Sequence, residues 1–314
     1  MNRFSGSALA ILLTLALLPL HAVAAPLKIV TSIKPITLMV RAIAPESALV
    51  TTLIPAGASP HTYQLRPSDR QALADADLIF WVGPDMELFL DRILSSTELA
   101  PKSHQLMSEM VIADDQEHRH HDEHEDHDSH GSEDGHHHNG VDPHIWLDPE
   151  AALGMTTIIE QALVGVADDA PSSEADGIAQ RLQQFEAQLN EKETKIRKQL
   201  TQLDAVDIFT YHDAFRRFAE HYGMTIAGAL TITPEKTPGA KHMQDIQNRL
   251  HAAHHPCLMT EPQFNRDWWQ SLSEGIDITI VTWDPLASDI ADSRNGYVEF
   301  QQSLADAALK CLPK

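Results

Sequence analysis

The sequence predicts an α/β protein of two lobes, each with a mostly parallel sheet flanked by helices, joined by one long helix. Two observations predict this fold class. Short β-branched runs alternate with amphipathic segments near both ends of the chain, which is typical of βαβ units and parallel sheets. Between the two alternating regions lies one long segment whose apolar residues recur at helical spacing.

The alternating regions predict the elements of each lobe, taken in order along the chain. In the first region we expect strands at 27–31, 49–54 and 78–82 and helices at 34–44, 66–76 and 86–94. In the second region we expect strands at 207–211, 225–231, 257–260 and 276–282 and helices at 214–222, 241–253, 267–274 and 296–312. A chain of this length usually divides its core, so we expect an N-terminal lobe at 25–170 and a C-terminal lobe at 206–314.

Residues 171–205 are expected to form the long linking helix. Pro171-Ser172 marks its start, and the helix follows these two residues. Gln, Glu and Lys fill the positions between its apolar residues. The pattern covers fewer than four heptads, so a coiled coil is the weaker alternative. We therefore expect a rigid helix packed along both lobes. Its apolar stripe consists of Ile178, Leu182, Phe185, Leu189, Ile196, Leu200 and Leu203.

Residues 1–24 have the pattern of an export signal. Arg3 supplies the positive charge, residues 8–20 form an apolar run, and Ala22-Val23-Ala24 is a cleavage pattern. The run is shorter than the roughly 20 apolar residues that span a bilayer. We expect a cleaved signal peptide and a soluble mature protein outside the cytoplasm. An uncleaved anchor is the alternative.

The net charge and the cysteine content limit the functions that the protein can have. The formal net charge of −22 argues against a nucleic-acid partner, because phosphate binding needs a basic face. Cys257 and Cys311 are the only cysteines. In an oxidising compartment such a pair is expected to form a disulfide. Metal binding through the two thiols is the alternative, but no C-x-x-C spacing supports it.

A histidine-rich insert at 114–140 interrupts the first lobe. It interleaves nine histidines with ten acidic residues and a single base, Arg119, so it is expected to be disordered without a ligand. Imidazole and carboxylate groups together suit Zn²⁺, Cu²⁺ and Ni²⁺, and we expect an auxiliary metal-collecting role. A solvated insert with no metal role is the alternative. The histidines are His118, His120, His121, His124, His127, His130, His136, His137 and His138.

A tight metal site needs side chains on rigid elements, and four residues are candidates. His61 and His212 lie at or just past the carboxyl ends of expected strands, where open α/β sheets bind ligands. His144 follows the insert in Asp142-Pro143-His144, and Asp284 ends a late strand. Each residue alone is weak evidence for a metal site, but three imidazoles and one carboxylate together would complete the tetrahedral ligand shell of a zinc ion. Other histidines outside the insert, including His221, His242, His251, His254 and His255, are interpreted as surface residues.

Several segments, running in order along nearly the whole chain, resemble the zinc-binding proteins of high-affinity ABC importers (ZnuA-type, cluster A-I solute-binding proteins). They are residues 59–69 (SPHTYQLRPSD), 81–87 (WVGPDME), 142–149 (DPHIWLDP), 211–215 (YHDAF), 238–242 (PGAKH), 261–264 (EPQF) and 284–286 (DPL). The resemblance implies two four-stranded lobes bridged by a long helix. It implies a monomeric periplasmic protein that passes Zn²⁺ to a membrane permease with its cytoplasmic ATPase.

The resemblance also implies the ligand set His61, His144 and His212, with Asp284 at the carboxylate position. The cysteine pair is similar to that of zinc-type members, consistent with a disulfide. Pro60 stands where some zinc-type members have an acidic residue. The fourth ligand is therefore left open among Asp284, water and a histidine of the insert.

Other functions on this scaffold remain to be weighed. A manganese binder usually has a glutamate where His212 stands, and an all-imidazole trio favours Zn²⁺ over Mn²⁺. An adhesin is a second alternative. Three histidines on zinc could also serve a hydrolase, with Asp213 or Glu261 as the base. The sequence has no H-E-x-x-H or G-x-S-x-G motif, so we expect a binding protein and no enzyme.

Overall fold

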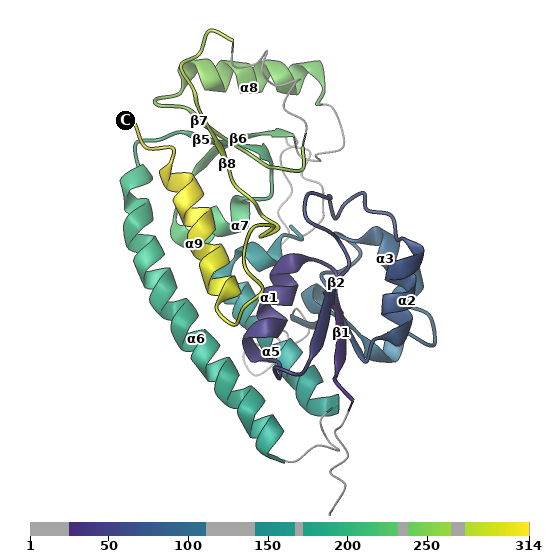
Figure 1. The fold of residues 1–314 in the computed structure, drawn as a ribbon. Coiled ribbons are helices and arrows are strands. Elements are labelled where there is room, and N and C mark those ends of the chain that lie inside the picture. The colour runs from purple at the N-terminus through teal and green to yellow at the C-terminus, as the bar shows by residue number, and fades with distance from the viewer. Residues whose placement is uncertain (1–24, 111–141, 167–171, 232–237, 265–273, 314) are drawn as a thin grey trace, which may run out of the picture.

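The structure is a computed structural model that describes residues 25–110, 142–166, 172–231, 238–264 and 274–313. The expected signal peptide, the histidine-rich insert at 114–140 and the expected helix up to residue 273 lie outside the described residues. Within the described chain, two parallel four-stranded sheets lie at opposite ends of a long helix-covered body (Figure 1). This arrangement confirms the expected fold class.

The first sheet has the strand order β2-β1-β3-β4, and every neighbouring pair is parallel. Its strands carry mostly β-branched and aromatic side chains, and β3 is buried throughout. The strands are β1 (Lys28–Thr31), β2 (Leu49–Thr52), β3 (Leu78–Trp81) and β4 (Ser103–Gln105), and the helices are α1 (Lys34–Ile43), α2 (Pro67–Asp75), α3 (Leu88–Leu94) and the 3-10 turn η1 (Ala100–Lys102).

The second sheet repeats this plan with the order β6-β5-β7-β8, again all parallel. Its central strands β5 and β7 are completely buried. The strands are β5 (Ile208–His212), β6 (Ile226–Thr231), β7 (Cys257–Thr260) and β8 (Thr279–Thr282), and the helices are α7 (Arg216–Tyr222), α8 (Ala240–Ala252) and α9 (Gly296–Leu309).

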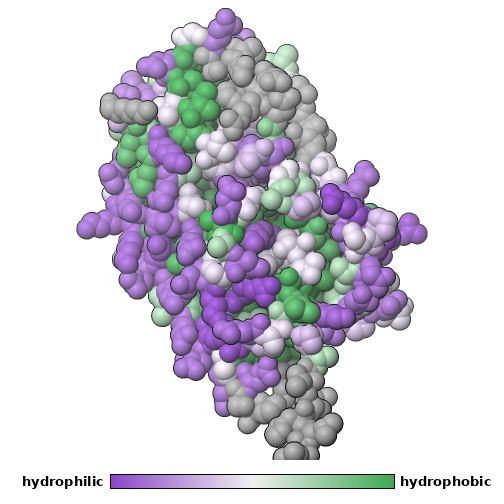
Figure 2. Space-filling model, viewed as in Figure 1, coloured by the Kyte–Doolittle hydropathy of each residue, from purple (hydrophilic) through white to green (hydrophobic). Residues whose placement is uncertain are grey.

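The segment between the sheets consists of η2 (Ile145–Leu147), α5 (Pro149–Val166), α6 (Ser172–Leu200) and η3 (Thr201–Leu203). Helix α6 is the expected long helix, and it contacts α1, α5 and α9, which belong to different lobes (Figure 1). Its buried residues include Ile178, Phe185, Leu189 and Ile196. Hydrophilic side chains dominate the edge of the molecule along which α6 runs (Figure 2). The helix therefore presents one apolar face inward, as its sequence pattern predicts.

One hydrophobic core runs through both lobes. It joins residues of β1, β3 and α1 to residues of α6, α7 and α9, while a smaller cluster lies between the second sheet and α8. Helices α1 and α9 approach so closely that a Cβ on Gly296 would lie 2.7 Å from Leu38 Cδ2. Arg41 and Asp292 form an ion pair at 3.2 Å beside this contact. These contacts hold the two lobes in one arrangement.

The structure also shows a disulfide and a short fourth strand in the first sheet. Cys257, the first residue of β7, is disulfide-bonded to Cys311, which follows α9, so the expected pairing is confirmed. Strand β4 was not predicted from the sequence pattern, because three residues are too few to show an alternation. Among the described residues, no helix is both long enough and apolar enough to cross a bilayer.

Candidate metal site

Three histidines that are far apart in the sequence meet between the two lobes. One ring nitrogen each of His61, His144 and His212 lies within 4.8 Å of the other two. Their ring centroids are 5.2–6.0 Å apart. His144 and His212 are buried, whereas His61 is half-buried. Among the described residues, this is the one group of histidine, cysteine and acidic side chains with the geometry to hold a metal ion.

Each histidine is placed by a different local structure. His61 lies in the loop after β2, where Gly57 adopts a φ of +77° and the His61 backbone N–H donates to Ser59 Oγ at 3.3 Å. His144 directly precedes η2, after a proline that limits the backbone. His212 is the last residue of β5. The parallel sheets therefore bring His61 and His212 to the expected strand ends, and the connecting segment adds His144.

The spacing of two of these rings fits zinc closely. The Nε2 atoms of His144 and His212 are 3.3 Å apart. A tetrahedral ion with Zn–N bonds of about 2.0–2.1 Å places two ligand nitrogens about 3.3–3.4 Å apart. The cavity at this point measures about 10 Å³, the size for a single ion, and Trp146, Phe264 and Pro285 are among its walls. The geometry therefore suits one small cation.

One buried and one half-buried carboxylate orient the rings of His212 and His144. Glu261 Oε1 lies 2.5 Å from His212 Nδ1, and Asp142 Oδ1 lies 2.7 Å from His144 Nδ1. A carboxylate at Nδ1 accepts the proton of that nitrogen and leaves Nε2 without a proton, in the form that binds a metal. Both rings consequently turn their Nε2 atoms toward the common point.

The surroundings of the site favour the neutral form of two of its imidazoles, those of His61 and His144. Burial, followed by repulsion from His144 and His212 in their charged forms, lowers the pKa of His61 to about 3. Burial also lowers the pKa of His144, against the opposing effect of its hydrogen bond to Asp142. Metal ligands must be deprotonated, so a cation entering this site need not displace protons from these two rings near neutral pH.

The fourth candidate, Asp284, is not in the cluster of three histidines. Its Oδ1 accepts the backbone N–H of Leu286 at 2.9 Å, and its Oδ2 accepts that of Ser288 at 2.6 Å. The turn that it holds includes Ala287, which has a left-handed φ of 54°. An aspartate before proline is a common turn former, and here both carboxylate oxygens serve the turn.

Two of the histidines that were interpreted as surface residues form hydrogen bonds or ion pairs in the structure. His221 is only 10% exposed and lies between two carboxylates, so its interpretation as a surface residue was wrong. His242 is half-buried and hydrogen-bonds the carbonyl of Ala229 at 3.1 Å. The remaining three, His251, His254 and His255, are exposed, as expected.

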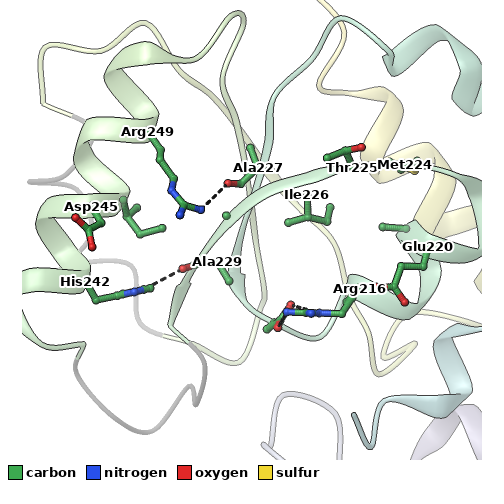
Figure 3. A pocket seen from close by; sticks show the side chains of 14 residues that line it. Arg216, Glu220, Met224, Thr225, Ile226, Ala227, Ala229, His242, Asp245 and Arg249 are labelled. Atoms are coloured by element: carbon green, nitrogen blue, oxygen red, sulfur yellow. Dashed lines mark hydrogen bonds and ion pairs between the residues drawn. The ribbon is translucent and has the colours of Figure 1, made fainter. Parts of the chain in front are cut away.

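His242 belongs to a larger cavity of about 500 Å³ in the second lobe, between α7, β6 and α8. Figure 3 shows Arg249 and His242 reaching from α8 to the carbonyls of Ala227 and Ala229 on the edge strand β6. These contacts cover an otherwise free strand edge. Asp213, which pairs with Arg216, also lines this cavity and not the one at the three histidines.

Sequence reasoning did not identify Glu261 or Asp142 as partners of the histidines. Both lie within segments already singled out, but their roles depend on which strands are neighbours. Strands β5 and β7 pair with Thr210 opposite Met259, so His212 and Glu261 leave the sheet side by side. The acidic residue two positions before His144 is a signal that could have been used, because Asp side chains often bond the backbone two residues ahead.

Comparison with known proteins adds an independent result. A sequence model of the family described as "Zinc-uptake complex component A periplasmic" matches residues 29–311. The high-affinity zinc uptake system protein ZnuA of Haemophilus ducreyi is 38% identical over 310 residues, covering 96% of this chain and 97% of the relative. The protein of that name from Yersinia pestis is 33% identical over 299 residues, covering 90% and 91%.

Solved structures share the fold. A crystal structure of ZnuA superposes with a TM-score of 0.68 at 20% identity, covering 90% of this chain and 99% of the other. The periplasmic zinc-binding protein TroA from Treponema pallidum gives 0.70 at 20% identity, covering 92% and 99%. A solute-binding protein of Pseudomonas aeruginosa in complex with Mn²⁺, FpvC, gives 0.70 at 16% identity, covering 91% and 98%. The fold alone therefore does not identify the metal.

Proposed function

The chain belongs to the ZnuA family of periplasmic zinc-uptake components, and from this premise we propose that it captures Zn²⁺ and delivers it to a membrane permease. His61, His144 and His212 are the proposed ligands. The observation that carries the assignment is the 3.3 Å spacing of the His144 and His212 Nε2 atoms, which is that of two ligands on one tetrahedral zinc ion.

Three nitrogen donors favour zinc over manganese at this site. Imidazole suits Zn²⁺, whereas Mn²⁺ prefers carboxylate and other oxygen ligands. The two nearby carboxylates face Nδ1 atoms and act through the histidines. Since both oxygens of Asp284 hold a turn, we propose that solvent or a histidine of the insert completes the zinc shell.

The hydrolase alternative is disfavoured by the contacts of its two candidate bases. Glu261 accepts a hydrogen bond from Gln263 and faces His212 Nδ1, and Asp213 pairs with Arg216. Neither carboxylate is placed to take a proton from a metal-bound water. A zinc-binding function needs only the three histidine ligands and no catalytic base.

The proposed cycle assigns the insert at 114–140 a collecting role. Its histidines and carboxylates would raise the local Zn²⁺ concentration beside the site between the lobes. The signal peptide would direct export of the protein and then be cleaved. The mature protein, as a monomer, would dock on the membrane permease, which works with a cytoplasmic ATPase. Family membership supports the transport step, and the acidic histidine-rich composition supports the collecting step.

A chelator-competition titration of the mature protein tests the function. We expect one tight zinc site that is lost in His61→Ala, His144→Ala and His212→Ala and retained in His251→Ala, an exposed histidine on α8. Deleting residues 114–140 should lower the total zinc bound and leave the tight site. Tight binding that disappears with the insert and survives His144→Ala would disprove the ligand assignment, and tighter binding of Mn²⁺ than of Zn²⁺ would disprove zinc as the cargo.

A further inference from the structure

The segment that carries His144 is held at both ends by a helix of the opposite lobe. Helix α7 (Arg216–Tyr222) starts shortly after His212, the last residue of β5, so the helix and that proposed ligand belong to the same lobe. Residues 142–148 belong to the chain between the lobes, yet their polar groups bond to α7. The relative position of His144 and His212 therefore depends on how α7 holds this segment.

The first contact is made by Arg217. Its Nε donates to the carbonyl oxygen of Asp142 at 2.9 Å, and its Nη2 donates to the same atom. Its Nε also lies 3.7 Å from Asp142 Oδ2. The other carboxylate oxygen, Oδ1, accepts the backbone N–H of His144 at 3.0 Å and faces the ring Nδ1 of His144. Arg217 thus fixes the residue that orients the ring of His144.

The second contact is made by His221, one helical turn further on the same face of α7. Its Nδ1 lies 3.1 Å from Asp148 Oδ1, and its Nε2 lies 3.0 Å from Glu193 Oε1 on α6. Both ring nitrogens thus face carboxylates, and a ring with a proton on each nitrogen can donate to both of them; Nε2 also lies 3.3 Å from Arg197 Nη2. Asp148 also caps α5 by accepting the N–H of Glu150 at 2.9 Å. The far end of the segment is therefore tied to α5, α6 and α7 together.

We propose that Arg217 and His221 are positioning residues that hold the 142–148 segment so that His144 meets His212 at the spacing of a zinc ion. The inference rests on the proposed zinc-binding function. The middle of the segment has its own anchor, because Trp146 Nε1 donates to the carbonyl of Pro285 at 2.7 Å. Loss of the α7 contacts should therefore leave the fold in place and allow the His144 ring to move. Ligands that are less well positioned bind the metal more weakly.

The variants Arg217→Met, Arg217→Lys and His221→Gln test this proposal. Arg181→Met is the matched control, because Arg181 Nε on α6 also donates to a backbone carbonyl, that of Ile43 at 2.6 Å, between elements remote from the site. Zinc affinity is measured by chelator competition, the visible absorption of bound Co²⁺ reports the ligand geometry, and thermal unfolding of the metal-free protein reports stability.

We expect Arg217→Met to weaken zinc binding by about 10–100-fold, the usual loss for outer partners of metal ligands, and to alter the Co²⁺ spectrum. Arg217→Lys should recover part of the affinity, because an ammonium group keeps the charge without the two-pronged contact. His221→Gln should show a smaller loss. Arg181→Met should lower the unfolding temperature and leave affinity and spectrum unchanged.

Two outcomes overturn the proposal in distinguishable ways. If Arg217→Met, Arg217→Lys and His221→Gln all bind zinc like the wild type and give its Co²⁺ spectrum, the positioning role is wrong while the zinc function stands. If wild type and His144→Ala bind zinc equally, the proposed function itself fails. Should Arg217→Met not fold, the Arg217→Lys and His221→Gln affinities decide the question.

Discussion

The Nδ1 atom of His212 lies 2.5 Å from Oε1 of Glu261, and both side chains are almost completely buried. The other carboxylate oxygen of Glu261 accepts a hydrogen bond from Gln263 at 2.8 Å. Since β5 and β7 are neighbouring parallel strands, the two residues leave the sheet at the same edge. The carboxylate therefore fixes both the tautomer and the direction of the His212 ring.

The first prediction concerns this carboxylate. Glu261→Gln should weaken zinc binding by about 10–100-fold, because an amide holds the Nδ1 proton less strongly and can also turn its NH₂ group toward the ring. Chelator competition measures the loss. Glu87→Gln is the control, because Glu87 is a second completely buried glutamate that bonds the backbone of Gly83 and is not among the residues lining the zinc cavity. Equal affinities for Glu261→Gln and wild type would contradict the role of Glu261.

The second prediction separates the two possible roles of Asp284. Asp284→Ala should lower the free energy of unfolding by about 2 kcal/mol, since two backbone N–H groups lose a charged acceptor. Its zinc affinity should stay near that of the wild type. Urea unfolding and chelator competition on the same preparation measure both quantities. A loss of affinity as large as that of His144→Ala would instead identify Asp284 as the fourth ligand.

The third prediction concerns the disulfide that joins β7 to the end of α9. Cys257 and Cys311 are 54 residues apart, and closing a loop of this size stabilises a protein by about 4 kcal/mol on the chain-entropy model. Replacing both cysteines by serine should lower the free energy of unfolding by roughly that amount. Neither cysteine is among the residues lining the zinc cavity, so zinc affinity should be preserved. Loss of the tight zinc site in a folded double variant would show that the bond also shapes the site.

The fourth prediction is a pH dependence of stability that comes from His221. Its hydrogen bond to Asp148 raises its pKa, against the opposing effect of burial, and the contact with Glu193 raises it further. Arg197 of α6 shares Glu193, and the Tyr222 ring lies 4.8 Å away. A raised folded-state pKa means that the contribution is complete below the unfolded value of about 6.5 and is lost as pH rises through the folded value.

His221→Gln should therefore reduce stability most below the unfolded-state pKa of about 6.5 and progressively less as the pH rises through the raised folded-state pKa, where wild-type His221 also loses its charge. Urea unfolding across this range measures the difference between the two proteins. His251→Gln is the control, because His251 is exposed on α8, and its difference from wild type should not vary with pH. A stability difference for His221→Gln that grows with rising pH would contradict the assignment of a charged ring.

The local pattern of the sequence predicted most of the fold. Among the described residues, most strands and helices of four or more residues lie close to their expected positions, because burial on one or both faces imposes a periodicity that neighbouring residues share. Helix α5 (Pro149–Val166) is the exception, since no residue range was predicted for a helix there. The stripe of α6 was predicted for the same reason, and residues such as Ile178 and Phe185 are buried. Strand β4 was missed because its three residues take their conformation from pairing with β3.

Chain order and residue type also determined which histidines could meet. His61 and His212 follow expected strands, and parallel sheets place strand ends at a common edge, so the sequence predicted that these two side chains meet. It predicted His144 as the third member, and the three histidines do lie together in the structure. It could not decide what Asp284 does, because an aspartate before proline can bind a metal or hold a turn. Only the tertiary structure shows that its carboxylate accepts the backbone N–H groups of the turn.

Only the tertiary structure decided which groups support the three proposed metal ligands. Glu261 reaches His212 across 49 residues of sequence, and Arg217 reaches Asp142 across 75. Such contacts leave no local periodicity, since they depend on strand order and on how one helix lies across a distant segment. The sequence determined the elements and the ligand types through local burial patterns, and the packing of the two lobes decided the orientation of each ring.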